Sequence, residues 1–210
     1  MKKILYCLLA SFIMSSCTNA QEPSSNEAVT IMPIEVDQRE KNLLDSIAGD
    51  QLFAFDVKVN DKTTEEQYLN ISIDYYENGD LLKEVAGMGV QLVKDVNTVL
   101  ISRVEEELND DKYIRWGGAV VTESGFSKFK SNMILANNNS GRALSSQLSN
   151  ERLLYENKPQ IVAYIINHHE RSISATNNVF DGVEKEINRI IQQYESVYFV
   201  TVELDSKNEK

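Results

Sequence analysis

Cysteine is almost missing from this 210-residue sequence, which contains only Cys7 and Cys17. Residues 18–210 therefore cannot form a disulfide framework, and they offer no thiolate for a zinc site and no thiol nucleophile. Histidine is equally scarce, with two residues in the whole chain. Chemistry that needs several cysteines or several converging imidazoles is therefore excluded.

Basic residues are also in short supply. Lysine and arginine together number 21 against 32 acidic residues, which gives a formal net charge of −11. Nucleic-acid binding requires a basic stripe that displaces phosphate counterions, and the sequence contains none, so no nucleic-acid partner is expected. The same balance argues against a domain that binds anionic lipids through its overall charge.

No apolar run in the sequence reaches the length of about 20 residues that a membrane-spanning helix needs. The run Ile4 to Met14 follows Lys2 and Lys3 and is interrupted only by Ser11. Its length matches the apolar region of a signal peptide, which is about 7–15 residues. We interpret residues 1–16 as an export signal that is removed from the mature chain.

The residues that follow this run, Met14-Ser15-Ser16-Cys17, resemble the lipobox of bacterial lipoproteins, although Met14 replaces the usual leucine. The resemblance implies that the Cys17 thiol receives a diacylglyceryl group and that Cys17 becomes the first residue of the mature chain. Two or more acyl chains anchor a protein stably, because each buried CH2 contributes about 0.8 kcal/mol. The expected location is the cell membrane, lipid-anchored at the extracytoplasmic face. The alternative is an ordinary secretory signal in which Cys17 is incidental.

Residues 17–50 read as the lipidated cysteine and a polar tether that lifts the rest of the chain off the bilayer. Within them, the apolar patch Val29 to Val36 could add a first strand, but Pro33 limits it to a sheet edge. Asn42 to Ala48 has the pattern of a short helix. We expect one extracytoplasmic domain over residues 51–205.

This domain carries short strand signals separated by turns at regular intervals. Residues 69–75 alternate between apolar and polar side chains, which is typical of a half-buried strand. Asn78-Gly79 follows at once and predicts a tight hairpin turn. Further turns are expected at Asn97, at 109–111 and at Ser124-Gly125. Such spacing favours an antiparallel meander or sandwich.

The last third of the chain mixes helix and strand signals. We expect a short helix within 143–155, a central strand over 160–167 that is apolar on both faces, and a terminal strand over 197–204. Apolar residues at helical spacing predict an amphipathic helix over 179–194, with Asn178 as its N-cap. The expected fold is therefore mainly β (α+β): an antiparallel β-sandwich or meander with a C-terminal amphipathic helix before the last strand.

His168-His169-Glu170 is the one histidine-bearing cluster and a weak metal candidate. Adjacent residues on a strand point to opposite faces, so His168 and Glu170 could share a site while His169 could not, unless the segment is a loop. Two ligands fall short of a closed zinc shell. The alternative is that these polar residues are the solvated exit of a buried strand.

Glu105-Glu106-Glu107, with Asp110 and Asp111, supplies oxygen ligands of the kind that calcium prefers. Their spacing does not match a helix–loop–helix calcium loop. A charge run at a strand end more commonly forms a solvated turn that discourages edge pairing. Calcium binding is therefore a secondary possibility here.

Two glycine pairs, Gly87-Met88-Gly89 and Gly117-Gly118, lack the spacing of a phosphate cradle or a dinucleotide-binding turn. We expect bulges or bends of a curved sheet at these positions. No Gly-x-Ser-x-Gly nucleophile motif is present. No cofactor is expected.

Together these features favour a non-enzymatic, membrane-anchored extracytoplasmic module that binds an envelope protein or a small molecule. The alternative is a hydrolase or metal-dependent enzyme that uses His168 or His169 with nearby carboxylates. Ser172-Ile173-Ser174 and the segment Ser196-Val197-Tyr198-Phe199-Val200-Thr201-Val202 are similar to stretches of uncharacterised Gram-positive surface lipoproteins. That resemblance implies no particular activity.

Overall fold

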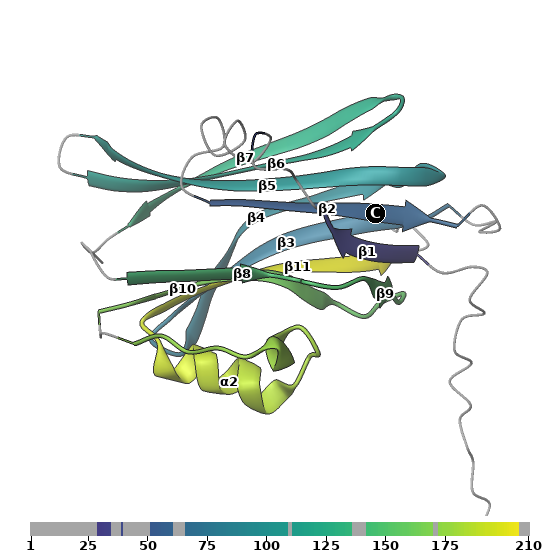
Figure 1. Cartoon of the computed structure of the whole chain (residues 1–210). Helices are drawn as coiled ribbons and strands as arrows, with labels where there is room; N and C mark the ends of the chain where they lie inside the picture. The colour runs from purple at the N-terminus through teal and green to yellow at the C-terminus, as the bar shows by residue number, and fades with distance from the viewer. Residues whose placement is uncertain are drawn as a thin grey trace, which may run out of the picture.

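The structure is a computed structural model, and it describes residues 29–34, 39, 51–60, 66–108, 111–135, 142–169 and 172–205. Two antiparallel sheets pack face to face, with one short helix before the last strand (Figure 1). The expected fold class is therefore confirmed as a mainly β sandwich.

Sheet A has six strands and sheet B has five. In spatial order, sheet A consists of β7 (Gly125–Leu135), β6 (Asp111–Thr122), β5 (Asp95–Leu108), β2 (Gln51–Val59), β1 (Val29–Pro33) and β9 (Arg152–Leu154). Sheet B consists of β4 (Asp80–Gln91), β3 (Tyr68–Glu77), β11 (Ser196–Asp205), β10 (Gln160–His168) and β8 (Arg142–Gln147). The 3-10 helix η1 (Asn177–Val179) and the helix α2 (Glu184–Gln193) lie against sheet B on the side away from sheet A (Figure 1).

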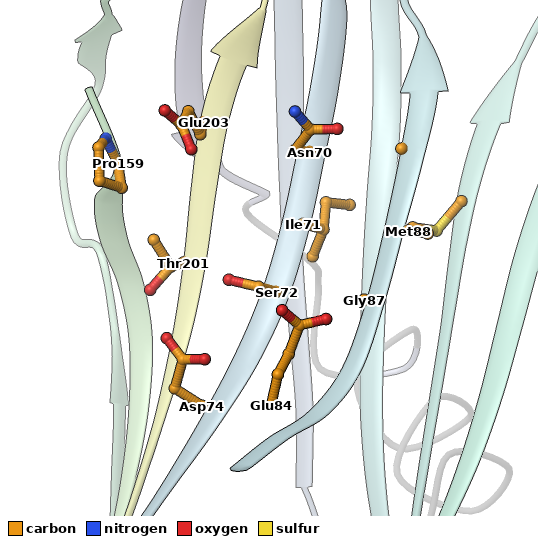
Figure 2. A pocket seen from close by; sticks show the side chains of 11 residues that line it. Asn70, Ile71, Ser72, Asp74, Glu84, Gly87, Met88, Pro159, Thr201 and Glu203 are labelled. Atoms are coloured by element: carbon orange, nitrogen blue, oxygen red, sulfur yellow. The ribbon is translucent and has the colours of Figure 1, made fainter. Parts of the chain in front are cut away.

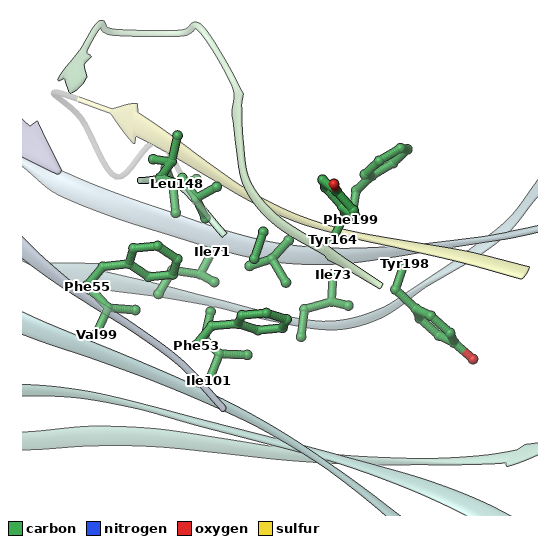
Figure 3. Packing of buried hydrophobic residues seen from close by; sticks show 14 of the residues in the cluster. Phe53, Phe55, Ile71, Ile73, Val99, Ile101, Leu148, Tyr164, Tyr198 and Phe199 are labelled. Atoms are coloured by element: carbon green, nitrogen blue, oxygen red, sulfur yellow. The ribbon is translucent and has the colours of Figure 1, made fainter. Parts of the chain in front are cut away.

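The core fills the space between the two sheets. Apolar and polar side chains alternate along β3, so that one face of this strand is buried, whereas β10 and the first half of β11 are buried on both faces. Phe53, Phe55 and Ile101 of sheet A face Ile71 and Ile73 of sheet B (Figure 3). A second apolar layer lies between sheet B and its helical cap. There, Tyr164 of β10 stacks on Phe180, with ring centroids 5.4 Å apart.

Several local predictions are confirmed. Asn78 and Gly79 form the turn between β3 and β4, with positive φ angles of 51° and 98°. Ser124 lies in the turn between β6 and β7. The central position of β10 is also confirmed, because β11 and β8 flank it on either side.

The turn expected at Asn97 lies earlier in the chain. Asn97 is fully buried inside β5, and the connection from β4 to β5 runs through residues 92–94. The Asn97 side chain accepts a hydrogen bond from the Val93 amide and donates to the carbonyls of Val93 and Val57. Asn97 therefore lies in the strand that follows the turn, and its side chain stabilises the turn at residues 92–94.

The short helix expected within 143–155 is wrong. This segment forms β8 and β9, which belong to different sheets. Leu144 and Leu148 have helical spacing, but β8 pairs with the free edge of β10. The apolar strand β10 is buried on both faces and needs a hydrogen-bonding partner on each side, and this requirement outweighs the local pattern.

The amphipathic helix is shorter than expected, and Asn178 does not cap it. Thr176 caps η1, and α2 begins only at Glu184, after Val183, which makes no side-chain cap hydrogen bond. Gly182 separates the two helical segments with a φ of 68°, a conformation that favours glycine. This glycine is the signal that splits the predicted helix.

Strand β1 is part of the sandwich although it lies in the range that the sequence suggested as a tether. It pairs with β2 along Val29–Pro33 and with β9 on its other edge. The folded body therefore includes β1 as well as the region expected over 51–205. The short helix predicted at 42–48 lies outside the described residues.

Candidate functional site

The outer face of sheet B carries a polar stripe. Asn70, Ser72 and Asp74 point outward from β3, alternating with buried apolar residues. On the neighbouring strand, Thr201 pairs with Ser72 and Glu203 pairs with Asn70. These side chains surround a cavity of about 490 Å³, shown in Figure 2. We call it the strand cavity.

Two glycines of β4 hollow out this cavity. Gly87 and Gly89 pair with Ser72 and Asn70, so any side chain on them would project onto the same outer face. A Cβ atom at Gly89 would lie 2.9 Å from the Asn70 amide oxygen, and one at Gly87 would lie 2.4 Å from a carboxylate oxygen of Glu84. The glycine pair therefore opens space for polar side chains, and the register shift between β3 and β4 lies just before it.

That register shift places two carboxylates opposite each other. Across the bulge, Glu84 of β4 pairs with Asp74 of β3. Figure 2 shows the side chains of Asp74, Glu84 and Glu203 around the same opening. No ion pair joins any of the three to a lysine or arginine of the described residues.

The environment of Asp74 disfavours its charged form. Burial raises the pKa of this carboxyl, and the negative charge of Glu84 raises it further. A cationic group placed between the two carboxylates would offset their repulsion and favour the charged form of Asp74. The strand cavity is thus suited to an amine or a guanidinium group.

A second cavity of about 700 Å³ adjoins the strand cavity, and Asp74, Pro159 and Thr201 line both. We call it the cap cavity, because one wall is the segment that joins η1 to α2. Ile161, Phe180 and Ile187 give it an apolar part. The two cavities together form one groove across the outer face of sheet B.

The cap beside this groove is held in place by polar contacts. The guanidinium of Arg152 contacts the carboxylate of Asp181 at 2.5 Å, which links the β9 side of the groove to the η1–α2 connection. Arg189 donates to Glu186 and to the carbonyl of Ser174. The hydrogen bonds from Arg189 lower the pKa of Glu186 to about 2, so this pair stays charged at neutral pH.

The histidines lie away from the groove. His168 is the last residue of β10 and is buried against Tyr194, whereas Ile161 of the groove lies seven residues earlier on the same strand. Seven residues of a strand span about 23 Å. The histidines therefore do not share a site with the carboxylates of the groove.

Both histidines approach Glu195, a residue that the sequence did not suggest. The Glu195 carboxylate lies 3.7 Å from Nδ1 of His168 and 3.6 Å from Nε2 of His169. This is possible because His169 lies beyond the end of β10, where the alternation of strand faces no longer applies. Glu170 and Cys17 lie outside the described residues.

The acidic run at the end of β5 is neutralised in part by arginines of the same sheet. Glu105 contacts Arg103 and Glu106 contacts Arg115, each at 2.6 Å. Asp110 lies outside the described residues. Within the part of the chain that the structure describes, no three histidine, cysteine or acidic side chains are arranged to hold a metal ion.

Sequence reasoning missed the groove residues Asp74, Glu84 and Glu203. A signal for the first of them was present, since the polar positions of 70–74 form one face of a predicted strand. Glu84 and Glu203 could not be assigned to that face, because their placement depends on strand pairing across a bulge and across the sheet.

The chain was compared with known proteins. A family model described as the YgaN domain matches residues 30–204. The matched range begins within β1 and ends within β11, so it spans both sheets of the sandwich. No curated protein and no solved structure matches the chain.

Proposed function

This chain belongs to the YgaN domain family, and we propose that it is a lipid-anchored extracytoplasmic binding module whose ligand carries an amine or guanidinium group. The groove on sheet B is the proposed binding site. Its strand cavity receives the cationic group, and its cap cavity receives an apolar part of the same ligand. The ligand class includes basic segments of envelope proteins and small amine-bearing molecules.

The observation that carries this proposal is the set of unpaired carboxylates in the strand cavity. Asp74 is half-buried beside Glu84, an arrangement that costs folding free energy as long as no cation is bound. Strain of this kind is typical of sites that are completed by a ligand. The hydroxyls of Ser72 and Thr201 supply further acceptors in the same cavity.

Replacing Asp74 by asparagine should weaken the binding of a short peptide of lysine and leucine about tenfold, equivalent to about 1.4 kcal/mol. The reason is the loss of the charge that faces the ligand's ammonium group. Isothermal titration calorimetry measures the change. Binding should also weaken on acidification, at a higher pH than an ordinary aspartate would require, because the pKa of Asp74 is raised above 3.8.

The same substitution should leave the thermal midpoint unchanged or raise it. The folded-state pKa of Asp74 lies above the unfolded-state value, so this group's stabilising contribution is present at low pH and is lost as the pH rises. Glu123→Gln is the matched control, because it removes one carboxylate from the exposed turn between β6 and β7. Equal weakening by both variants, or tight binding of the Nζ-acetylated peptide, would contradict the proposed site.

The anchoring part of the proposal rests on the lipobox-like residues that end at Cys17. In the described residues, no helix has the length and hydropathy needed to cross a bilayer. A lipid at Cys17 would supply the membrane attachment.

We expect Cys17→Ala to release the protein from the membrane fraction, because no thiol remains to accept lipid. Mass spectrometry of the wild-type mature chain should find acyl chains on its first residue. Recovery of the wild-type protein in the soluble fraction with an unmodified amino terminus would refute the anchor. Groove binding is measured separately, so either half of the proposal can fail alone.

A further inference from the structure

The outer face of sheet A carries an exposed apolar patch at one end of the sandwich. Its members are Val96, Val121 and Phe126, with 41%, 41% and 68% of their surfaces exposed. Val121 pairs directly with Phe126 across the β6–β7 hairpin. Thr98 of β5 pairs with Val121, so Val96, two residues before Thr98 on the same strand, lies diagonal to Val121 on the same face. We call these three residues the end patch.

We propose that the end patch docks into the membrane interface and thereby fixes the orientation of the domain, with the groove of sheet B turned away from the lipid. This inference rests on the proposed anchor at Cys17. It names a contact surface that the anchor alone does not require.

The end patch lies at the end of sheet A where β1 begins. Val29, the first residue of β1, pairs with Val59, and Val59 pairs with Asp95 at the start of β5. The start of β1 and the β6–β7 turn therefore lie at the same end of sheet A (Figure 1). Cys17 precedes Val29 by 12 residues, which reach at most about 40 Å even when fully extended.

The charged side chains near the end patch also favour a membrane surface. Three lysines and three carboxylates lie close to the patch along the chain or by strand pairing, namely Lys58, Lys94 and Lys128 with Asp56, Asp95 and Glu123. Among the described residues of sheet A, the surroundings of the patch therefore carry no excess of negative charge, in a chain with a net charge of −11. Lys128 Nζ lies 5.8 Å from the centroid of the Phe126 ring, where it can reach phosphate groups while the ring enters the interface.

The opposite end of the sandwich offers a comparison. Leu81, on the strand that follows the β3–β4 turn, is 57% exposed. Its acidic neighbours Glu77, Asp80 and Glu84 would be repelled by an anionic membrane surface. That end carries Tyr75 and Tyr198 in sheet B, next to Trp116 and far from the start of β1. Apolar exposure is similar at the two ends, but Leu81 has one lysine, Lys83, beside three carboxylates, whereas the end patch has as many lysines as carboxylates and lies near the start of β1.

A weak contact is sufficient once the chain is tethered. The anchor converts docking into an intramolecular step at high effective concentration, so a few apolar side chains can hold the domain against the surface. Because burial of Phe126 and its neighbours supplies the attraction, docking should persist at high salt.

An environment-sensitive fluorophore on Ser124→Cys tests the contact. Cys7 lies in the segment that is removed and the Cys17 sulfur carries the lipid, so the new cysteine is the one free thiol of the processed full chain. The chain is purified from an exporting, lipidating host and reconstituted in phosphatidylglycerol–phosphatidylcholine vesicles that contain an acyl-chain quencher. We expect a blue shift and strong quenching at position 124. The same label on Asp80→Cys, in the opposite hairpin, should show neither.

Two further variants test whether the end patch itself causes the blue shift. Phe126→Ser in the Ser124→Cys chain should abolish the blue shift, whereas Leu81→Ser should leave it intact. A label at position 124 that stays water-exposed while the protein co-floats with the vesicles overturns the docking and leaves the anchor standing. A chain that does not co-float at all overturns the anchor, and the docking with it.

Discussion

Replacing Asn97 by alanine should lower the free energy of unfolding by about 3 kcal/mol, because one buried and two partly buried backbone groups lose their partner. The side chain is fully buried and serves the Val93 amide, the Val93 carbonyl and the Val57 carbonyl. These bonds stabilise the connection from β4 to β5, where the chain passes from sheet B to sheet A. For a chain of this size the thermal midpoint should fall by roughly 6–12 °C.

The aspartate variant separates hydrogen bonding from packing at this position. Asn97→Asp keeps the shape and one acceptor but cannot donate when ionised, and it buries a charge. It should therefore be no more stable than the alanine variant at neutral pH. Asn178→Ala is the control, since Asn178 is exposed and does not cap α2, and it should change stability by less than about 0.5 kcal/mol. Wild-type stability of Asn97→Ala would contradict the role assigned to this side chain.

The second large effect is expected at Arg103, a charged residue with 2% of its surface exposed. Its guanidinium lies 5.4 Å from the centroid of the Tyr198 ring and contacts Glu105 at 2.6 Å, but its Nε has no hydrogen-bond partner among the described residues. Arg103→Ala removes a large side chain between the sheets and should cost about 3 kcal/mol through the cavity that remains. Urea unfolding followed by the fluorescence of Trp116, the single tryptophan, measures this, because Trp116 pairs with Arg103.

Arg103→Met should behave quite differently from the alanine variant. The Arg103 guanidinium is buried, and its ion pair with the half-exposed Glu105 gains little over a well-packed apolar side chain of similar volume, because desolvation of the buried charge offsets the attraction. The methionine variant should therefore lie within about 1 kcal/mol of wild type or be more stable. The control is Arg115→Met on the solvent face of the adjacent strand, where both partners of the Arg115–Glu106 pair are nearly half exposed. That substitution should cost less than about 1 kcal/mol. A large loss at Arg103→Met would show that the charge itself is needed.

The pKa of Tyr198 also indicates that water is largely excluded around Arg103. Burial raises the pKa of the Tyr198 hydroxyl to about 12, although the positive charge of Arg103 acts in the opposite direction. Burial therefore dominates over the nearby charge. The arginine lies in a region where water is largely excluded, which is the condition under which its own desolvation is expensive.

Predictions that depend on residues close together in the sequence were correct, whereas predictions that depend on contacts with other strands were wrong. The alternation of 69–75 and the Asn78-Gly79 turn depend on neighbouring residues, and both were predicted correctly. The segment 143–155 was predicted incorrectly, because its strands form only by pairing with β10 and β1. The Asn97 turn failed for a related reason, since its side chain acts on residues that precede it in the chain and on another strand.

The same distinction applies to charge. Overall composition correctly describes an acidic chain, and it argued against binding to lipid through net charge. Composition cannot reveal that Lys58 and Lys128 lie near one end of sheet A while Asp74, Glu84 and Glu203 line a cavity on sheet B. Strand pairing separates the two groups onto opposite faces of the sandwich.

The amino-acid sequence by itself determined the strand-rich character of this protein, its tight turns and the short helix before its last strand, because these follow from backbone preferences and from side-chain periodicity over a few residues. Tertiary structure alone decided which strands share a sheet, which polar side chains are buried and where the groove lies. The carboxylates of that groove come from β3, β4 and β11, and hydrogen bonding between the strands brings them together.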